Sequence, residues 1–225
     1  MIQRLARPAL LVMLAGSLGL AGCGNTANDM GTAISIAIKS NVAQRRGTES
    51  KITQDQVVRT LSRNPNPIAL IDLETRKSQS LMAQIQNNRG YRTYATPQRQ
   101  TVTVRGGMIT ASRGLGGDLM SSNVKSLLPV VQSRSRGIAD YEMRFLNSED
   151  KTYTLHYTCA VHEGAPVQVV SGLINESGKA MQAICTGDGP SFTNTYIVAP
   201  DGEILSTRQW MGPFNKYIAF QQLRR

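Results

Sequence analysis

Hydrophobic residues repeat with a helical spacing only near the start of the chain. Residues 53–62 predict an amphipathic helix, because Thr53 and Gln56 have the spacing of a capping box. Three apolar residues share one face of that helix: Val57, Val58 and Leu61. Residues 32–44 combine alternating Ile with Ala, which fits a strand or a helix, and we favour a helix. The pattern therefore predicts one or two helices near the N-terminus.

Farther along the chain, the apolar residues come in short runs of strand length. The runs 68–74 and 80–86 predict two strands, and residues 101–112 predict a hairpin in which Gly106 and Gly107 form a tight turn. A glycine-rich loop follows this hairpin. Seven more strands are predicted in the second half of the chain, at residues 139–147, 151–161, 165–172, 179–187, 192–199, 203–211 and 216–223.

Short connections separate these later strands, and two of the turn signals are Glu163-Gly164 and Ser177-Gly178. Because short connections join neighbours, the strands should pair in sequence order as an antiparallel meander. So many strands curl rather than stay flat. The predicted fold class is mainly β, with a curled antiparallel meander sheet that forms a half-barrel or barrel. The helix at residues 53–62 is expected to pack on its concave face or across an open edge.

Residues 1–22 have the layout of an export signal. Arg4 and Arg7 precede an apolar stretch that is too short for a stable membrane span. The segment ends in Leu20-Ala21-Gly22-Cys23, which resembles the lipobox of bacterial lipoproteins. We therefore expect the signal to be removed and Cys23 to be acylated. An ordinary secretory signal cut nearby is the alternative.

The acyl chains decide where the domain is expected. Two or more chains hold a protein stably on a membrane, and no later segment reaches 18 uninterrupted apolar residues. Residues 23–31 are small and polar and predict a tether, which leaves residues 32–225 as a single periplasmic β-rich domain. Gly24 stands where an Asp commonly retains lipoproteins at the inner membrane. The expected location is therefore the outer membrane, with the domain facing the periplasm.

Positive charge is concentrated in the middle of the chain. The formal net charge is +10, and residues 76–137 hold ten basic residues against one acid. Such an excess favours polyanions. Export argues against nucleic acid and leaves anionic lipid headgroups, an acidic polysaccharide or an acidic partner protein. The leading candidates for an anion-facing or partner surface are Arg89, Arg92, Arg99, Arg105 and Arg113. Alternatively, these arginines only keep the surface soluble.

Two cysteines remain if Cys23 is acylated. Cys159 and Cys185 can then pair in the oxidising periplasm, and two separate buried thiols are the alternative. His156 and His162 lie close to Cys159, but the odd spacing places Cys159 on the opposite face of a strand. We therefore expect a disulfide and no metal site.

The sequence offers no recognisable catalytic constellation. The carboxylates that invite attention lie in turn contexts, such as Asp201-Gly202, and the glycine-rich loop lacks the Lys and Ser or Thr of a phosphate-binding loop. No serine has the surroundings of a nucleophile elbow. We therefore expect a protein that is not an enzyme and carries no cofactor.

Three segments resemble one family of bacterial lipoproteins: residues 68–90, 102–119 and 194–223. In the last segment the resemblance is carried by Asn194-Thr195-Tyr196, Gly202, a hydroxyl at Ser206 or Thr207, Arg208-Gln209 and Gly212. These residues are similar to those of the YjbF/GfcB lipoproteins, which are associated with group 4 capsule and exopolysaccharide secretion. The resemblance implies a curled antiparallel sheet with accessory helices and no cofactor. It also implies a role beside an outer-membrane β-barrel companion that helps polysaccharide leave the cell.

The expected function is a non-enzymatic accessory factor in capsule or exopolysaccharide assembly or secretion. Its expected partners are the membrane, through the N-terminal lipid, and an outer-membrane β-barrel or other polysaccharide export proteins, with an acidic polysaccharide as a further candidate. The alternative is a periplasmic lipid- or lipoprotein-binding carrier, which requires an apolar cavity. A glycan-modifying enzyme would instead require convergent carboxylates.

Overall fold

The computed structural model describes residues 51–225, so the signal segment, Cys23, the tether and the expected helix at residues 32–44 lie outside the described residues. The helical elements are α2 (Gln54–Arg63), the short 3-10 helix η2 (Glu74–Arg76) and α3 (Leu127–Gln132). The strands are β1 (Ile68–Leu73), β2 (Ser78–Asn88), β3 (Tyr91–Ala95), β4 (Thr101–Arg105), β5 (Met108–Arg113), β6 (Ser121–Asn123), β7 (Gly137–Leu146), β8 (Thr152–Ser171), β9 (Ile174–Gly187), β10 (Phe192–Val198), β11 (Ile204–Trp210) and β12 (Tyr217–Arg224).

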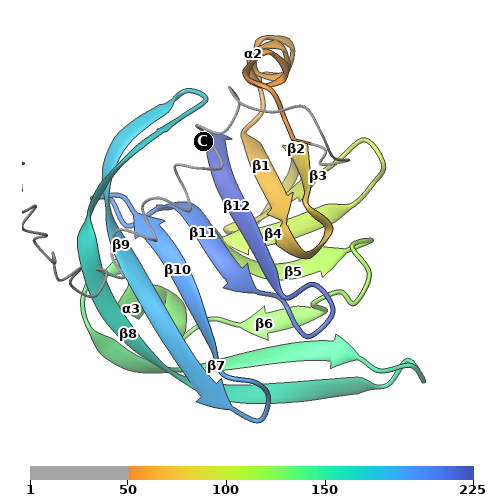
Figure 1. The fold of residues 1–225 in the computed structure, drawn as a ribbon, viewed down its shortest axis with the longest axis vertical. Coiled ribbons are helices and arrows are strands. Elements are labelled where there is room, and N and C mark those ends of the chain that lie inside the picture. The colour runs from red at the N-terminus through yellow and green to blue at the C-terminus, as the bar shows by residue number, and fades with distance from the viewer. Residues whose placement is uncertain (1–50) are drawn as a thin grey trace, which may run out of the picture.

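All twelve strands form one antiparallel sheet that curls into a nearly closed barrel (Figure 1). The strand order is β5-β4-β3-β2-β1-β12-β11-β10-β9-β8-β7-β6. Two meanders, β1 to β5 and β6 to β12, are therefore joined by the pairing of β1 with β12. The predicted fold class, a curled antiparallel meander in a mainly β protein, is confirmed.

The two end strands of the sheet, β5 and β6, meet through the glycine-rich loop. The backbone N–H of Ser112 donates to the carbonyl of Leu119 at 2.9 Å. The guanidinium of Arg113 adds bonds to the carbonyls of Leu119 and Met120 at 3.1 and 3.0 Å. Asp118 shapes the loop, because its carboxylate accepts from the backbone N–H of Gly114 at 2.7 Å. These contacts draw the open edges together where the strand ladder itself stops.

Alternate residues of the strands fill the barrel interior with one hydrophobic core. Its largest fully buried side chains include Tyr94, Tyr141, Tyr196 and Phe220. Burial raises the pKa of Tyr141 to about 12, so its phenol stays neutral at physiological pH. The curled sheet therefore encloses packed side chains.

Polar residues of the segment 194–223 also point into the barrel. Gln209 of β11 accepts from the backbone N–H of Ile109 at 2.7 Å and donates to the carbonyl of the same residue at 3.3 Å. Thr207 donates to Gln209 at 3.1 Å, and Asn194 accepts from the backbone N–H of Trp210 at 2.8 Å. The bonds of Gln209 tie β5 across the barrel to β11, and the bond of Asn194 ties β10 to β11. The residues that carry much of the family resemblance therefore hold the interior together.

Helix α2 forms where the sequence predicts it, with the Thr53–Gln56 capping box and Asn64 as its C-cap. It packs on the outer face of β1 and β12, in the middle of the sheet, so the expected packing on the concave face or across an open edge is wrong. Val57 and Leu61 join an outer cluster that includes Ile68, Leu70 and Leu223. The reason lies in β1, whose alternate residues are apolar on both faces and need cover outside as well as inside. Val58, predicted on the same face, is 55% exposed.

The guanidinium of Arg224 in β12 fastens α2 to the barrel. It donates to the carbonyl of Leu61 at 2.8 Å and to the carbonyl of Asn64. Carbonyls at a helix C-terminus lack partners within the helix, and a cation suits the negative end of the helix dipole. A side chain of the last strand, β12, therefore caps the C-terminus of α2, the helix that precedes the first strand.

The turns predicted at Glu163-Gly164 and Ser177-Gly178 are wrong, because β8 and β9 run through both positions as one long hairpin. The pairing between Glu163 and Pro166 shifts register, so a bulge accommodates Gly164 without a turn. Gly178 lies within β9. Its lack of a side chain is explained by close packing, because a Cβ at this position would lie 2.6 Å from Cγ2 of Ile197. The two strands predicted at residues 151–161 and 165–172 are therefore one strand, β8, so the seven predicted strands become six. The hairpin turn between β8 and β9 lies at residues 172–173.

Three elements of the middle region were not predicted: β3, β6 and α3. β3 follows β2 through a two-residue turn at Arg89-Gly90, where both residues have positive φ. The signal for α3 is the spacing of Leu127, Leu128 and Val131, all of which are buried against the barrel core. Both β3 and α3 contribute to the candidate site described below.

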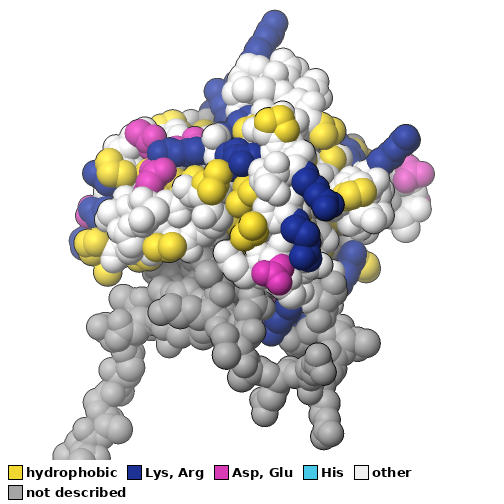
Figure 2. Space-filling view, turned by 90° about the horizontal axis from the view of Figure 1, so that it is seen from above, with side chains coloured by type: hydrophobic (Ala, Val, Ile, Leu, Met, Phe, Trp, Pro, Cys, Tyr) yellow, Lys and Arg dark blue, Asp and Glu magenta, His cyan; other side chains and the backbone are white. Residues whose placement is uncertain are grey.

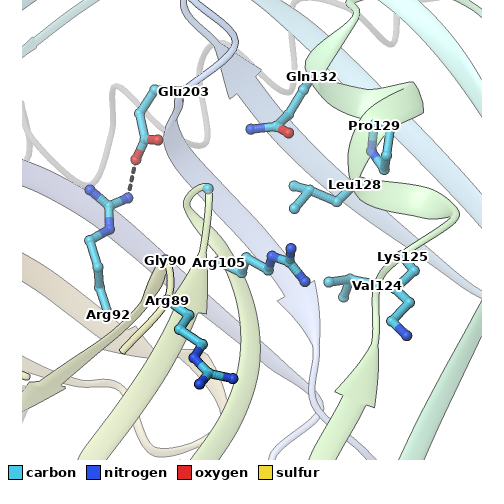
Figure 3. Close-up of a pocket in the computed structure, with 11 residues that line it drawn as sticks. Arg89, Gly90, Arg92, Arg105, Val124, Lys125, Leu128, Pro129, Gln132 and Glu203 are labelled. Carbon is cyan, nitrogen blue, oxygen red and sulfur yellow. Dashed lines mark hydrogen bonds and ion pairs between the residues drawn. The ribbon is translucent and has the colours of Figure 1, made fainter. Parts of the chain in front are cut away.

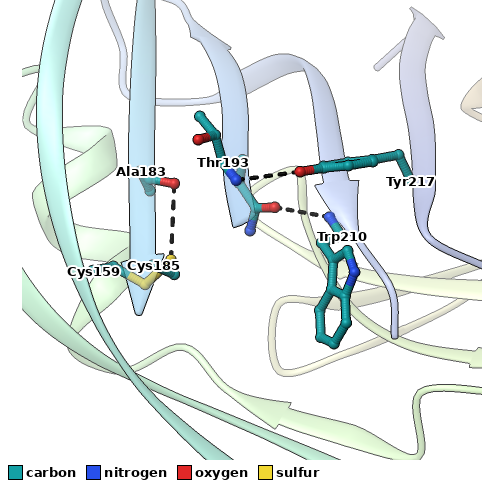
Figure 4. The surroundings of a disulfide bond; sticks show 7 residues. Cys159, Ala183, Cys185, Thr193, Trp210 and Tyr217 are labelled. Carbon is teal, nitrogen blue, oxygen red and sulfur yellow. Dashed lines mark hydrogen bonds between the residues drawn. A yellow bond between two sulfur atoms is a disulfide. The ribbon is translucent and has the colours of Figure 1, made fainter. Parts of the chain in front are cut away.

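Cys159 of β8 and Cys185 of β9 are directly paired across the strands and form a disulfide, as the sequence predicts (Figure 4). Beside it, the ring of Trp210 stacks on Phe192 with centroids 4.8 Å apart. Tyr157 meets Phe192 edge-to-face at the same distance. At this end of β10 and β11, the barrel is therefore cross-linked by the disulfide and filled with aromatic rings. None of the helices in the described part of the chain has the length and apolarity of a membrane span.

Candidate functional site

A pocket of about 570 Å³ lies at the opposite end of β10 and β11 (Figure 3). Three turns and one helix surround it: the β2–β3 turn, the β4–β5 turn, the β10–β11 turn and α3. Four basic side chains line it, with one acid: Arg89, Arg92, Arg105, Lys125 and Glu203. We call this the basic pocket.

The β2–β3 turn brings Arg89 to the basic pocket. Arg89 has φ +50° and Gly90 has φ +85°, which is the geometry of a primed two-residue hairpin turn. Asn or Gly normally occupies the first of these positions, since other residues pay a conformational cost there. The exposed Arg89 therefore costs conformational free energy at this position, and a role of its positive charge at the pocket would explain why an arginine is found there.

A neighbouring tyrosine orients Arg105, at the end of β4. Its guanidinium donates to the phenol oxygen of Tyr91 at 3.1 Å and lies 5.0 Å from the centre of the same ring. Tyr91 offers no carboxylate, so this contact holds the half-buried Arg105 side chain without pairing it with an acid.

The charge of Arg92, in contrast, is compensated inside the basic pocket. Its guanidinium forms an ion pair with Glu203. Gln222 of β12 donates to the same carboxylate at 2.7 Å and to the carbonyl of Ile204 at 2.8 Å. Glu203 is thus held by two partners from two strands.

Helix α3 supplies the apolar wall of the basic pocket through Leu128 and Pro129. The β4–β5 turn lies against this helix so closely that a side chain at Gly106 would meet the amide of Gln132 at 2.6 Å. At Gly107 it would meet the carbonyl of Ile204 at 2.2 Å. The glycine pair therefore allows close packing as well as the turn that the sequence predicts.

Three of the five arginines ranked highest from sequence, Arg89, Arg92 and Arg105, meet at the basic pocket. Arg113 instead binds carbonyls of the barrel seam, and Arg99 lies in the β3–β4 connection outside the pocket. Figure 2, viewed from the α2 end, also shows Lys and Arg spread over that face among apolar side chains. Part of the positive charge therefore lies on the general surface.

Among the basic-pocket residues that sequence reasoning missed are Lys125, Leu128, Gln132 and Glu203. Lys125 belongs to the basic segment but was not ranked among its leading residues. The other three depend on α3 and on the β10–β11 turn. The apolar spacing of α3 was a usable signal, whereas the position of Glu203 depends on the pairing of strands far apart in the chain.

His156, considered above for metal binding, lies at a smaller pocket of about 350 Å³. Its ring Nδ1 is 3.0 Å from the Asp188 carboxylate, and its Nε2 is 3.7 Å from that of Glu142. Hydrogen bonds from the backbone and ring of His156 lower the pKa of Asp188. Within residues 51–225, no group of three or more His, Cys, Asp or Glu side chains gathers as metal ligands would.

Fold and site together define a class of protein: a small, nearly closed antiparallel β-barrel domain with a cationic pocket at one end. The chain belongs to the YjbF family, because the model of that family, described as group 4 capsule polysaccharide lipoprotein gfcB, YjbF, matches residues 32–223. The resemblance seen in the sequence is therefore confirmed.

A solved structure supports the fold. The crystal structure of the hypothetical lipoprotein YmcC from Escherichia coli (K12) matches with a TM-score of 0.64 and 11% sequence identity. The match covers 78% of this chain and 98% of that one. Among curated proteins, none matches the sequence.

Proposed function

We propose that this protein is a lipid-anchored accessory factor in capsule or exopolysaccharide assembly or secretion, and that the basic pocket is where it meets an anionic glycan. Membership of a family of capsule polysaccharide lipoproteins supports the process. The observation that carries the role of the pocket is the convergence of Arg89, Arg105 and Lys125 around one cavity. Clefts lined by one sign of charge concentrate ligands of the opposite sign.

The proposed setting follows from the N-terminus. Cys23 would carry the acyl chains, and the domain would face the periplasm from the outer membrane. There it would lie beside a β-barrel or another component of the polysaccharide export machinery. The family description, which names a lipoprotein, supports a membrane-anchored location.

We also propose that the protein acts without catalysis. Glu203 is the carboxylate that lines the basic pocket, and Arg92 and Gln222 already hold it. Glycoside hydrolysis requires a pair of positioned carboxylates, one of which must be free to donate a proton. The basic pocket is therefore better suited to binding than to cleavage. The packed interior gives no support to the lipid-carrier alternative.

The proposal is tested in cells that produce the acidic surface polysaccharide. Replacing Arg89, Arg105 and Lys125 together by Glu should reduce surface polysaccharide severalfold without reducing the amount of protein in the membrane. The control makes the same change of charge at exposed Arg59, Arg63 and Arg99, outside the pocket, and should leave export unchanged. Normal export with the pocket reversed, measured by surface polysaccharide assay, would contradict the proposed role.

A further inference from the structure

We propose that the basic pocket selects a glycan unit that carries a single carboxylate, and that Glu203 sets this preference. The inference rests on the proposed function and names the ligand class. Figure 3 shows that the pocket has two ends: Arg89, Arg105 and Lys125 lie at one, and Arg92, Glu203 and Gln132 at the other.

The first end is available to an anion. Within residues 51–225, no hydrogen bond or ion pair engages the side chains of Arg89 and Lys125, and the hydrogen bond of Arg105 goes to the phenol oxygen of Tyr91, not to an acid. A carboxylate placed here gains charge-assisted hydrogen bonds, which are about twice as strong as neutral ones. A ligand without charge would leave three cations with no counter-charge.

The second end disfavours a further negative charge. The Glu203 carboxylate compensates Arg92 and is fixed by Gln222. A second anionic group at this end would face Glu203 and lose the attraction that Arg92 would otherwise give. Hydroxyl groups fit better, because the Gln132 amide and the Glu203 carboxylate offer both donors and acceptors. The two ends together favour a sugar unit that has one charge and several hydroxyls.

One wall of the pocket, on the side of α3, is apolar. Val124, Leu128 and Pro129 line it. An inorganic anion would leave this surface in water, whereas the C–H face of a pyranose ring would cover it. The volume of about 570 Å³ lies within the range of small-molecule sites. A uronic acid unit in a glycan chain has the charge, the hydroxyls and the apolar face that the basic pocket offers.

The ligand class is tested by calorimetric titration of the full-length protein, purified in a non-ionic detergent. The probes are trigalacturonate, its neutral methyl ester, inorganic phosphate and vesicles of phosphatidylglycerol. Trigalacturonate should bind at least about tenfold more tightly than its methyl ester, which loses a charged hydrogen bond, and than phosphate, which leaves the apolar wall exposed to water. Equal binding of the methyl ester, tighter binding of phosphate, or vesicle binding that depends on Arg89 would overturn the inference.

Two matched substitutions locate the binding. Arg89→Asn and Arg99→Asn remove the same charge at residues with φ +50° and +65°, and Asn tolerates both. Arg89→Asn should weaken trigalacturonate binding about tenfold, and Arg99→Asn by less than about twofold. Similar losses in both variants would mean that general surface charge does the binding.

The role of Glu203 has its own readout. Glu203→Gln keeps an acceptor for Arg92 and Gln222 but removes the negative charge, so phosphate should bind more tightly and the preference for trigalacturonate should narrow severalfold. An unchanged preference would remove Glu203 from the inference. Failure of the two proposals is distinguishable: binding that fails while the pocket variants still impair export leaves the proposed function standing. Binding that succeeds while export ignores the pocket leaves the ligand class standing.

Discussion

The two ends of β10 and β11 differ in what their side chains do. At the Phe192 and Trp210 end, aromatic rings pack against one another beside the Cys159–Cys185 disulfide, and both rings and both cysteines are buried. At the other end, the strands join in a turn that opens into the basic pocket. We call the first the aromatic end. Under the proposed function, stability is concentrated at one end of the barrel and binding at the other, in keeping with the tendency of binding regions to come from the less stable parts of a fold.

The largest expected effect is at the aromatic end. Trp210→Ala should lower the free energy of unfolding by about 3–5 kcal/mol, because it removes a buried ring that stacks on Phe192. Chemical denaturation measures this loss. Phe214→Ala is the control, since that ring is 61% exposed and should cost about 1 kcal/mol or less. Equal losses in the two variants would mean that aromatic packing does not concentrate stability at this end.

Removing the disulfide should have the next largest effect. The double variant Cys159→Ala and Cys185→Ala should lose about 2–4 kcal/mol, because the cross-link limits the freedom of the unfolded chain. The midpoint temperature of thermal unfolding should fall by about 2–4 °C for each kcal/mol of stability lost. Reduction of the unaltered protein is the matched control and should give a similar shift. Trigalacturonate binding by the folded double variant should be unchanged, and a large loss of binding would break the proposed separation of the two ends.

The smallest effect is expected at the basic pocket and has the opposite sign. Arg89→Asn should raise the free energy of unfolding by up to about 1 kcal/mol, because Asn relieves the left-handed backbone of the β2–β3 turn. Arg99→Asn should give a similar gain, which denaturation of both proteins would show. A clear decrease in the free energy of unfolding caused by Arg89→Asn would mean that Arg89 stabilises the fold. That result would contradict the proposed separation of stability and binding between the two ends.

Local signals predicted the parts of the fold that local physics determines. The Thr53–Gln56 capping box positioned α2, and short apolar runs positioned most strands. The glycine signals were ambiguous, because Gly106 is in a turn while Gly178 lies within a strand where another strand approaches closely. A single sequence shows that a glycine is present and leaves open which of the two reasons applies.

The basic pocket was predicted only in part because it combines residues that are distant in the chain. The excess of arginine between residues 76 and 137 pointed to the correct segment. The selection of Arg89 and Arg105 over Arg113 depends on the seam of the barrel, which occupies Arg113 with carbonyls. The position of Glu203 depends on the order of strands, which nearest-neighbour spacing does not reveal.

The pairing of β1 with β12 has a consequence for the way the chain matures. When the chain emerges with its N-terminus first, one edge of β1 has no strand partner until β12 follows some 150 residues later. Helix α2 likewise lacks its contact with Arg224 until the end of β12 has emerged. Contacts between such distant positions slow folding and prolong exposure of unpaired strands. On the proposed route of export across a membrane, the nascent domain would therefore need protection against self-association, and it would reach its native state only after translocation of β12.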